Sequence, residues 1–199
     1  LYTLVAECAG DFHAVRVGFR SVEIKNAVLL VNGRRILIKG TDRHEMMPRT
    51  GYTVTRAEMR HDIDVMKSLN VNAVRTSHYP NDPAWYSLCD ENGIYVVCEA
   101  NLESHDMGYG EESLAHRPDF LKAHLERGTN LVAVFRNHPS IIEWSLGNEA
   151  GFGENFRQEY RAIKATDATR PVQYERAGTS PDGTDVFCPM YAKPWDGAN

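Results

Sequence analysis

The sequence predicts an α/β fold: a (β/α)₈ TIM barrel that is incomplete, with about six strand–helix units present, preceded by a few β-strands. From residue 36 onward, apolar strand-like segments alternate with amphipathic helix-like segments, which is typical of right-handed βαβ units around a parallel sheet. Polar and ionisable residues gather at the carboxyl end of each expected strand, the face where barrel enzymes place their chemistry. Together these two patterns favour a barrel.

Residues 1–30 favour β-structure because apolar and polar side chains alternate along most of this stretch, as in half-buried strands. The apolar runs on either side of Asn32-Gly33 predict a tight hairpin, since this dipeptide readily adopts left-handed backbone conformations. We therefore expect a β domain that ends near residue 30 and a barrel segment over residues 31–199.

The barrel segment is expected to contain six strands and four helices. In the first helix, Met59, Ile63 and Met66 recur at helical spacing and define one buried face. The second helix opens with an Asp-Pro pair, as cap and first turn, and closes on a glycine. The third contains Gly128, which costs about 1 kcal/mol of helix stability. The expected strands are 36–45, 71–78, 94–101, 140–149, 171–178 and 185–191, and the expected helices are 55–70, 82–93, 119–138 and 155–166.

An open, doubly wound sheet is the competing architecture. Such a sheet usually carries a glycine-rich phosphate loop after its first strand, but residues 38–45 (IKGTDRHE) lack that pattern. The stretches GYGEES and GFGENF begin like such a loop, yet they lack its final glycine and do not directly follow the first strand. This leaves the barrel as the favoured architecture.

The candidate functional residues lie at the strand ends. Taken singly, each has a simpler explanation, because a glutamate at a strand end is usually solvated and a histidine or arginine there is usually structural. Their convergence changes this, since several carboxylates on one rim repel one another unless they bind a cation, share a proton or face arginines. In strand order the residues are Asp42, Arg43, His44 and Glu45; Arg75, Ser77 and His78; Glu99, Asn101, Glu103 and His105; Asn148 and Glu149; Tyr174 and Glu175; and Tyr191.

Composition and motifs exclude several classes of function. The net charge of −5 and the lack of any Lys/Arg run argue against a nucleic-acid partner, and the lack of an 18-residue apolar run argues against a membrane span. The four cysteines form no CxxC pair, so a thiolate zinc site is not expected. The stretch HEMMP has Pro48 where a zinc protease motif has histidine, and no GxSxG nucleophile elbow is present.

The strand-end residues also allow a metal site with oxygen and nitrogen ligands. Glu103 and His105 lie two positions apart, and Glu149 is expected at the same edge of the sheet. Two carboxylates and one imidazole suit Mg²⁺, Mn²⁺ or Zn²⁺, so spacing alone leaves the metal open.

Several stretches together resemble the β-galactosidase branch of the family 2 glycoside hydrolases. The order, spacing and residue identities of these stretches agree with that family from about Val17 to Tyr191. The resemblance implies a retaining enzyme that releases terminal β-D-galactosyl residues, and it implies that residues 1–30 are the end of an immunoglobulin-like sandwich domain. The stretches are DRHE (42–45), NAVRTSHYPNDPAWYSLCDENGIYVVCEANLESHDM (72–107), RNHPSIIEWSLGNEAGFG (136–153), and RPVQYE (170–175) with the later CPMYA (188–192).

The resemblance also assigns roles to the strand-end residues. It implies a general acid/base, residues that bind the sugar or the transition state, and a Mg²⁺ site, for which Mn²⁺ is an alternative. A second ion, Na⁺, is expected in the longer enzyme. The residues that the resemblance assigns to these roles are Glu149 as the acid/base; Asn148, Asn101, His44 and His78 as sugar-binding residues, of which the two histidines also act in catalysis; and Tyr191 as a catalytic tyrosine beside the nucleophile. They further include Arg75, which orients the carboxylates, and the metal ligands Glu103, His105 and Glu149.

The family's nucleophile is a second glutamate at the end of the seventh strand, which we expect beyond Asn199. We therefore expect the chain to be a fragment of a longer, homo-oligomeric enzyme that acts on a β-galactoside such as lactose, and to be inactive alone. Residues 1–10 show no signal-peptide pattern. A cytoplasmic location is favoured, and the true N-terminus is expected to lie before residue 1. The alternatives are a non-catalytic structural or sugar-binding fragment, a β-glucuronidase-type relative, and a metallohydrolase built on the metal ligands.

Overall fold

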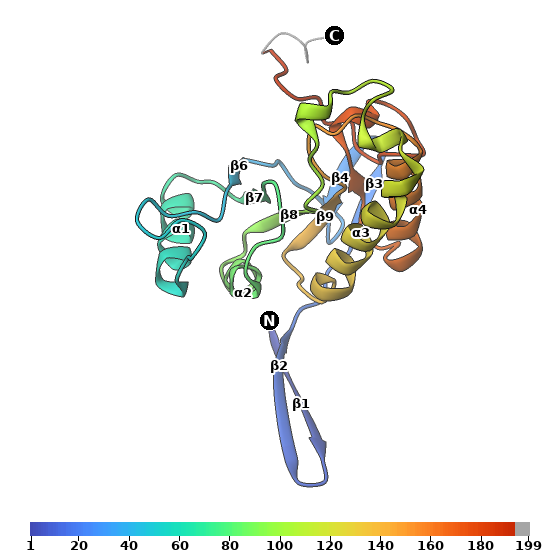
Figure 1. Cartoon of the computed structure of the whole chain (residues 1–199). Helices are drawn as coiled ribbons and strands as arrows, with labels where there is room; N and C mark the ends of the chain where they lie inside the picture. The colour runs from blue at the N-terminus through green and yellow to red at the C-terminus, as the bar shows by residue number, and fades with distance from the viewer. Residues whose placement is uncertain (194–199) are drawn as a thin grey trace.

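A five-stranded parallel sheet forms the centre of the computed structural model, which describes residues 1–193. Its strands pair in chain order, as in one wall of a barrel, and the four helices lie outside it (Figure 1). This confirms the incomplete barrel. The strands are β6 (Gly40–Arg43), β7 (Ala73–Thr76), β8 (Tyr95–Glu99), β9 (Ile141–Ser145) and β10 (Val172–Gln173), and the helices are α1 (Arg56–Ser68), α2 (Pro83–Asn92), α3 (Leu121–Phe135) and α4 (Glu154–Thr166).

The sixth predicted strand, 185–191, does not form among the described residues, so that prediction is wrong. One parallel bridge joins Gln173 to Val186, and the Asp185 N–H donates to the Val172 carbonyl at 2.7 Å. Pro189 has no N–H to continue such a ladder. The fifth strand is also shorter than expected, because the chain turns after Gln173 into the 3₁₀ helix η4 (Glu175–Ala177).

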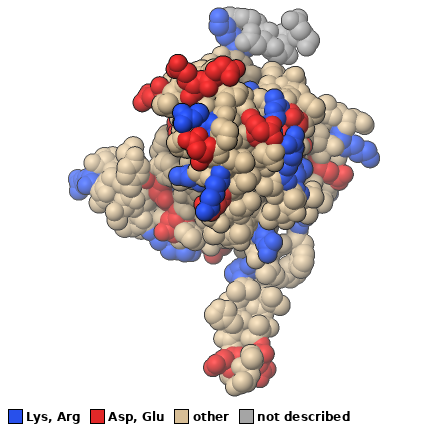
Figure 2. Space-filling model, turned by 45° about the vertical axis from the view of Figure 1, so that its right-hand side comes forward, with Lys and Arg blue, Asp and Glu red and all other residues tan. Residues whose placement is uncertain are grey.

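The N-terminal segment forms two small antiparallel sheets. Strands β1 (Tyr2–Cys8) and β2 (Asp11–Val17) make a hairpin that projects from the body (Figures 1 and 2). The second sheet contains β3 (Val22–Lys25), β4 (Val28–Val31) and β5 (Arg34–Arg35). It therefore includes residues on both sides of the predicted domain boundary at residue 30. Assignment of residues 1–30 to an immunoglobulin-like domain stays a prediction.

Local signals place the turns and helix ends where the sequence predicts them. Asn32 and Gly33, with φ of 52° and 71°, form the left-handed turn between β4 and β5. Thr55 and Glu58 make a reciprocal capping box at the start of α1. The N-cap of α2 is Asp82, and a left-handed glycine ends that helix.

The hydrophobic core lies between the outer face of the sheet and the helices. As predicted, α1 buries Met59, Ile63 and Met66 against it. The largest fully buried side chains include Trp85 of α2 and Trp144 of β9. Among the described residues, no helix is both long enough and apolar enough to cross a membrane.

Two buried glutamates have at least one carboxyl oxygen without a hydrogen-bond partner among the described residues. Glu143 of β9 leaves Oε1 unpaired among the described residues, and burial raises its pKa to about 8. Glu159 of α4 is 0 % exposed, both its oxygens lack partners there, and burial raises its pKa well above the ordinary value. Burial therefore favours the neutral acid form of both side chains.

The contact between α3 and α4 explains the glycine inside α3. A Cβ built on Gly128 would lie 2.6 Å from Oε1 and 2.8 Å from Cγ of Glu159. Because real Cβ atoms do not approach other heavy atoms so closely, glycine lets the two helices pack at this point. The helix-propensity cost predicted from the sequence is therefore offset by packing.

Replacing Gly128 by alanine is expected to destabilise the protein by about 1–2 kcal/mol, because overpacking outweighs the gain in helix propensity. Thermal or urea unfolding measures this change. Gly110→Ala is the control, since its Cβ would meet no described atom within 4 Å and should change stability by less than about 0.5 kcal/mol. A Gly128→Ala variant more stable than the parent would contradict the packing argument.

Candidate active site

The turn after β9 places Asn148 and Glu149 at the carboxyl edge of the sheet. Gly147 adopts φ of 152°, and a Cβ there would lie 2.4 Å from the Leu102 carbonyl oxygen, so glycine is required. The Asn148 N–H donates to that same oxygen at 2.8 Å, which joins the loops after β8 and β9. Glu149 follows in the left-handed region, with φ of 38°, and its N–H donates to Oε1 of Glu175 at 2.8 Å.

The Asn148 side chain joins two predicted site residues. Its Oδ1 accepts a hydrogen bond from Nη2 of Arg75 at 2.9 Å, and its Nδ2 donates to Oε1 of Glu103 at 3.0 Å. Asn148 is 1 % exposed and both bonds are partly buried, so together they hold the amide in one orientation. The amide is thus fixed beside Glu149.

Glu99 is the centre of a charged network at the end of β8. It is 0 % exposed and accepts hydrogen bonds from Nε of Arg75 and, at 2.7 Å, from Oγ of Ser145. Nδ1 of His78 lies 2.8 Å from its other oxygen, and this hydrogen bond raises the pKa of His78 although burial opposes the shift. Arg75 therefore contacts the Glu99 side chain directly and also holds the Asn148 amide, next in sequence to Glu149. Its role in orienting active-site carboxylates stays a prediction.

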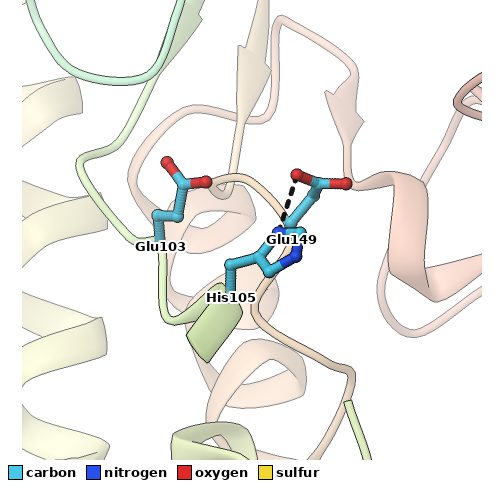
Figure 3. A group of neighbouring side chains, drawn as sticks. All are labelled: Glu103, His105 and Glu149. Atoms are coloured by element: carbon cyan, nitrogen blue, oxygen red, sulfur yellow. Dashed lines mark hydrogen bonds and ion pairs between the residues drawn. The ribbon is translucent and has the colours of Figure 1, made fainter. Parts of the chain in front are cut away.

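Glu103, His105 and Glu149 meet as predicted, although they come from two different loops (Figure 3). Their possible ligand atoms all lie within 4.8 Å of one another, and Nδ1 of His105 is 3.0 Å from Oε2 of Glu149. Two carboxylates and an imidazole within this distance fit one divalent cation of the Mg²⁺, Mn²⁺ or Zn²⁺ type. The residues present are thus suited to the metal that the sequence predicts.

Three other predicted residues lie around this group. His44 is exposed, and its ring meets the ring of His78 edge-on, with centroids 5.3 Å apart. Tyr191 is 82 % exposed, and its hydroxyl donates to Oε1 of Glu149 at 3.4 Å. Asn101 is exposed two residues before Glu103. The catalytic and sugar-binding roles of these residues stay predictions.

The structure adds residues to which sequence reasoning gave no role. Glu175 holds the Glu149 backbone, and burial raises the pKa of its carboxyl group. Its place at a strand end was a usable signal. Arg176 and Tyr109 also reach the site, as described below, although the sequence pattern pointed to neither: Arg176 lies in the 3₁₀ helix η4 and Tyr109 in the loop after β8.

The chain matches the family model described as "Glycosyl hydrolases family 2, TIM barrel domain" over residues 22–197. It is 52 % identical over 187 residues to "Beta-galactosidase 2" of Enterobacter cloacae and 49 % identical over 183 residues to "Beta-galactosidase" of Vibrio cholerae. These alignments cover 94 % and 92 % of this chain but 18 % of each relative.

Solved structures of family 2 enzymes are also similar to this chain. A β-glucuronidase from Ruminococcus gnavus superposes with a TM-score of 0.76 at 27 % identity, covering 94 % of this chain and 33 % of that one. The family 2 β-galacturonidase from Eisenbergiella tayi gives 0.69 at 31 % identity, covering 82 % and 29 %. The strand order, the glutamate-bearing turn after β9 and these matches lead to one conclusion: the chain belongs to glycosyl hydrolase family 2 and contains part of its TIM barrel domain.

Proposed function

We propose that this chain supplies the acid/base half of the active site of a retaining β-galactosidase and that it works within a longer polypeptide. The observation that carries the proposal is the placement of Glu149 beside a fixed Asn148 at the carboxyl edge of the sheet. The relatives named β-galactosidases, 49–52 % identical over most of this chain, support the galactoside as substrate.

A retaining glycosidase needs two carboxyl groups about 5–5.5 Å apart on either side of the glycosidic bond. In this proposal Glu149 protonates the leaving oxygen and then removes a proton from the attacking water. The nucleophile comes from chain outside residues 1–199, in keeping with the 18 % coverage of the curated relatives. Asn148, Asn101, His44 and His78 bind the galactosyl unit, and Tyr191 assists beside the nucleophile.

In this proposal Glu103, His105 and Glu149 hold Mg²⁺, or Mn²⁺ in its place. The bound ion supplies a fixed positive charge beside the acid/base carboxylate. Glu103 also holds Asn148 through a hydrogen bond of 3.0 Å, so the chain itself links the metal ligands to the proposed sugar-binding amide. Lactose as the substrate, a further Na⁺, a homo-oligomeric state and a cytoplasmic location are part of the same proposal.

The longer polypeptide is expected to hydrolyse a nitrophenyl β-galactoside on the order of 10²-fold or more faster than the matching β-glucuronide. Proton NMR should show β-galactose as the first product, because a retaining reaction proceeds through two displacements at the anomeric carbon. The 199-residue chain alone should be inactive in the same assay. A preference for the glucuronide would favour the function named for the Ruminococcus gnavus structures, and α-galactose as first product would exclude a retaining reaction.

A further inference from the structure

Arg176 of η4 reaches back over the proposed metal site. Its guanidinium carbon lies 3.6 Å from the centroid of the Tyr109 ring, a close cation–π contact. Its Nη2 lies 3.8 Å from Oε1 of Glu149, and its Nε lies 3.9 Å from Oε1 of Glu175. That Nε is buried without a hydrogen-bond partner among the described residues, so electrostatics and stacking hold the side chain.

Tyr109 connects Arg176 to the proposed metal ligands. Its hydroxyl lies 3.2 Å from Nδ1 of His105, and the two rings meet edge-on with centroids 5.5 Å apart. His105 in turn contacts Glu149 at 3.0 Å. Contacts therefore connect four side chains in a ring that includes the Glu149 carboxylate: Arg176, Tyr109, His105 and Glu149.

The two oxygens of Glu149 face different side chains. Oε2 lies beside His105, on the side of the proposed metal ligands, while Oε1 lies beside Arg176 and the Tyr191 hydroxyl. Glu149 is 11 % exposed at its side chain and Arg176 is 33 % exposed, so solvent screens this ion pair only in part. A metal ion at this site would share the carboxylate with a resident positive charge.

We propose that Arg176, positioned by the Tyr109 ring, competes with the divalent cation for Glu149 and so lowers the affinity of the metal site. This inference rests on the metal site named in the proposed function. Two cations that share one carboxylate repel each other, and near a protein surface removal of a single charge alters divalent-ion binding by roughly threefold to tenfold. Arg176 is a positioning residue here, because it acts on the metal through Glu149.

The test uses the longer polypeptide and Mn²⁺ alone as the probe, with free Mn²⁺ measured by electron paramagnetic resonance. Arg176→Gln, which removes the charge, is expected to bind Mn²⁺ about threefold to tenfold more tightly than the parent. Arg176→Lys keeps the charge and should stay within about twofold of the parent. Tyr109→Leu and Tyr109→Phe both remove the hydroxyl beside His105, but only Tyr109→Leu also removes the stacking ring. The leucine variant should therefore bind Mn²⁺ more tightly than the phenylalanine variant, by a smaller factor than Arg176→Gln gains over the parent.

Each other outcome overturns the proposal. An Arg176→Gln variant with unchanged or weaker Mn²⁺ affinity would show that Arg176 does not compete for Glu149, and a parent protein that binds no Mn²⁺ would remove the metal site itself. If the glutamine variant fails to fold, judged by circular dichroism, the Tyr109→Leu and Tyr109→Phe pair decides the question. The assay reads binding without turnover, so its failure is separate from a failure to hydrolyse galactosides.

Discussion

Replacing Glu149 by glutamine in the longer polypeptide is expected to lower kcat/KM for an unactivated alkyl β-galactoside by about 10²–10⁴-fold. The amide keeps the shape of the side chain but cannot give a proton to the leaving oxygen. A nitrophenyl galactoside should lose less in its first step, because nitrophenolate leaves without protonation. Steady-state kinetics on the two substrates measure the difference.

The second step gives an independent check on the same variant. Water activation needs the base, so the glycosylated enzyme should accumulate, and added azide should restore turnover of the nitrophenyl substrate because this anion attacks without a base. Glu111→Gln, at an exposed glutamate in the loop after β8, is the matched control and should behave like the parent. Because Glu149 is also a proposed metal ligand, each assay is repeated with and without Mg²⁺. Normal hydrolysis of the alkyl galactoside by Glu149→Gln would remove this residue from the acid/base role.

Replacing Arg75 by methionine is expected to cost about 3–5 kcal/mol of stability, because it leaves a buried carboxylate without its main cation. Glu99 is 0 % exposed and Arg75 is 19 % exposed at its side chain, so water cannot take over the interaction. The variant also loses the donor that holds Oδ1 of Asn148 at 2.9 Å, and galactosidase activity should fall with it. Urea unfolding measures the stability change.

A second substitution separates the charge effect from lost packing. In Arg75→Met with Glu99→Gln, no carboxylate is buried alone, so a large part of the lost stability should return. Arg60→Met removes an arginine from the exposed pair with Asp64 on α1 and should cost less than about 0.5 kcal/mol. An Arg75→Met variant as stable as Arg60→Met would contradict the buried network.

Most secondary structure could be predicted from the sequence because its signals are local. The burial of Met59, Ile63 and Met66 follows from helical spacing alone, and the α2 boundaries follow from the Asp82 cap and a terminal glycine. The sixth strand could not be predicted correctly. An apolar run such as 185–191 indicates burial, but strand formation also requires a partner ladder, and Pro189 cannot donate to one.

For the candidate site too, one part could be predicted from the sequence and another part could not. That Glu103, His105, Asn148 and Glu149 lie at one edge follows from the parallel topology, which brings every strand end to the same side. Which side chains contact one another does not follow, because that depends on loop conformations such as the left-handed turn at Glu149. The pairing of Asn148 with both Arg75 and Glu103 is therefore visible in the structure alone.

Local sequence patterns were enough to predict the four helices, the five strands of the parallel sheet and the ionisable groups at its carboxyl edge, because burial patterns, caps and turns are properties of neighbouring residues. The tertiary structure decided that Glu99 anchors the arginine network, that glycine at 128 is a packing requirement, and that Arg176 lies on Tyr109 beside Glu149. These contacts join residues 24 to 73 positions apart in the sequence, for example Arg75 with Asn148. Their distances are set by how the sheet and loops pack, which no local pattern records.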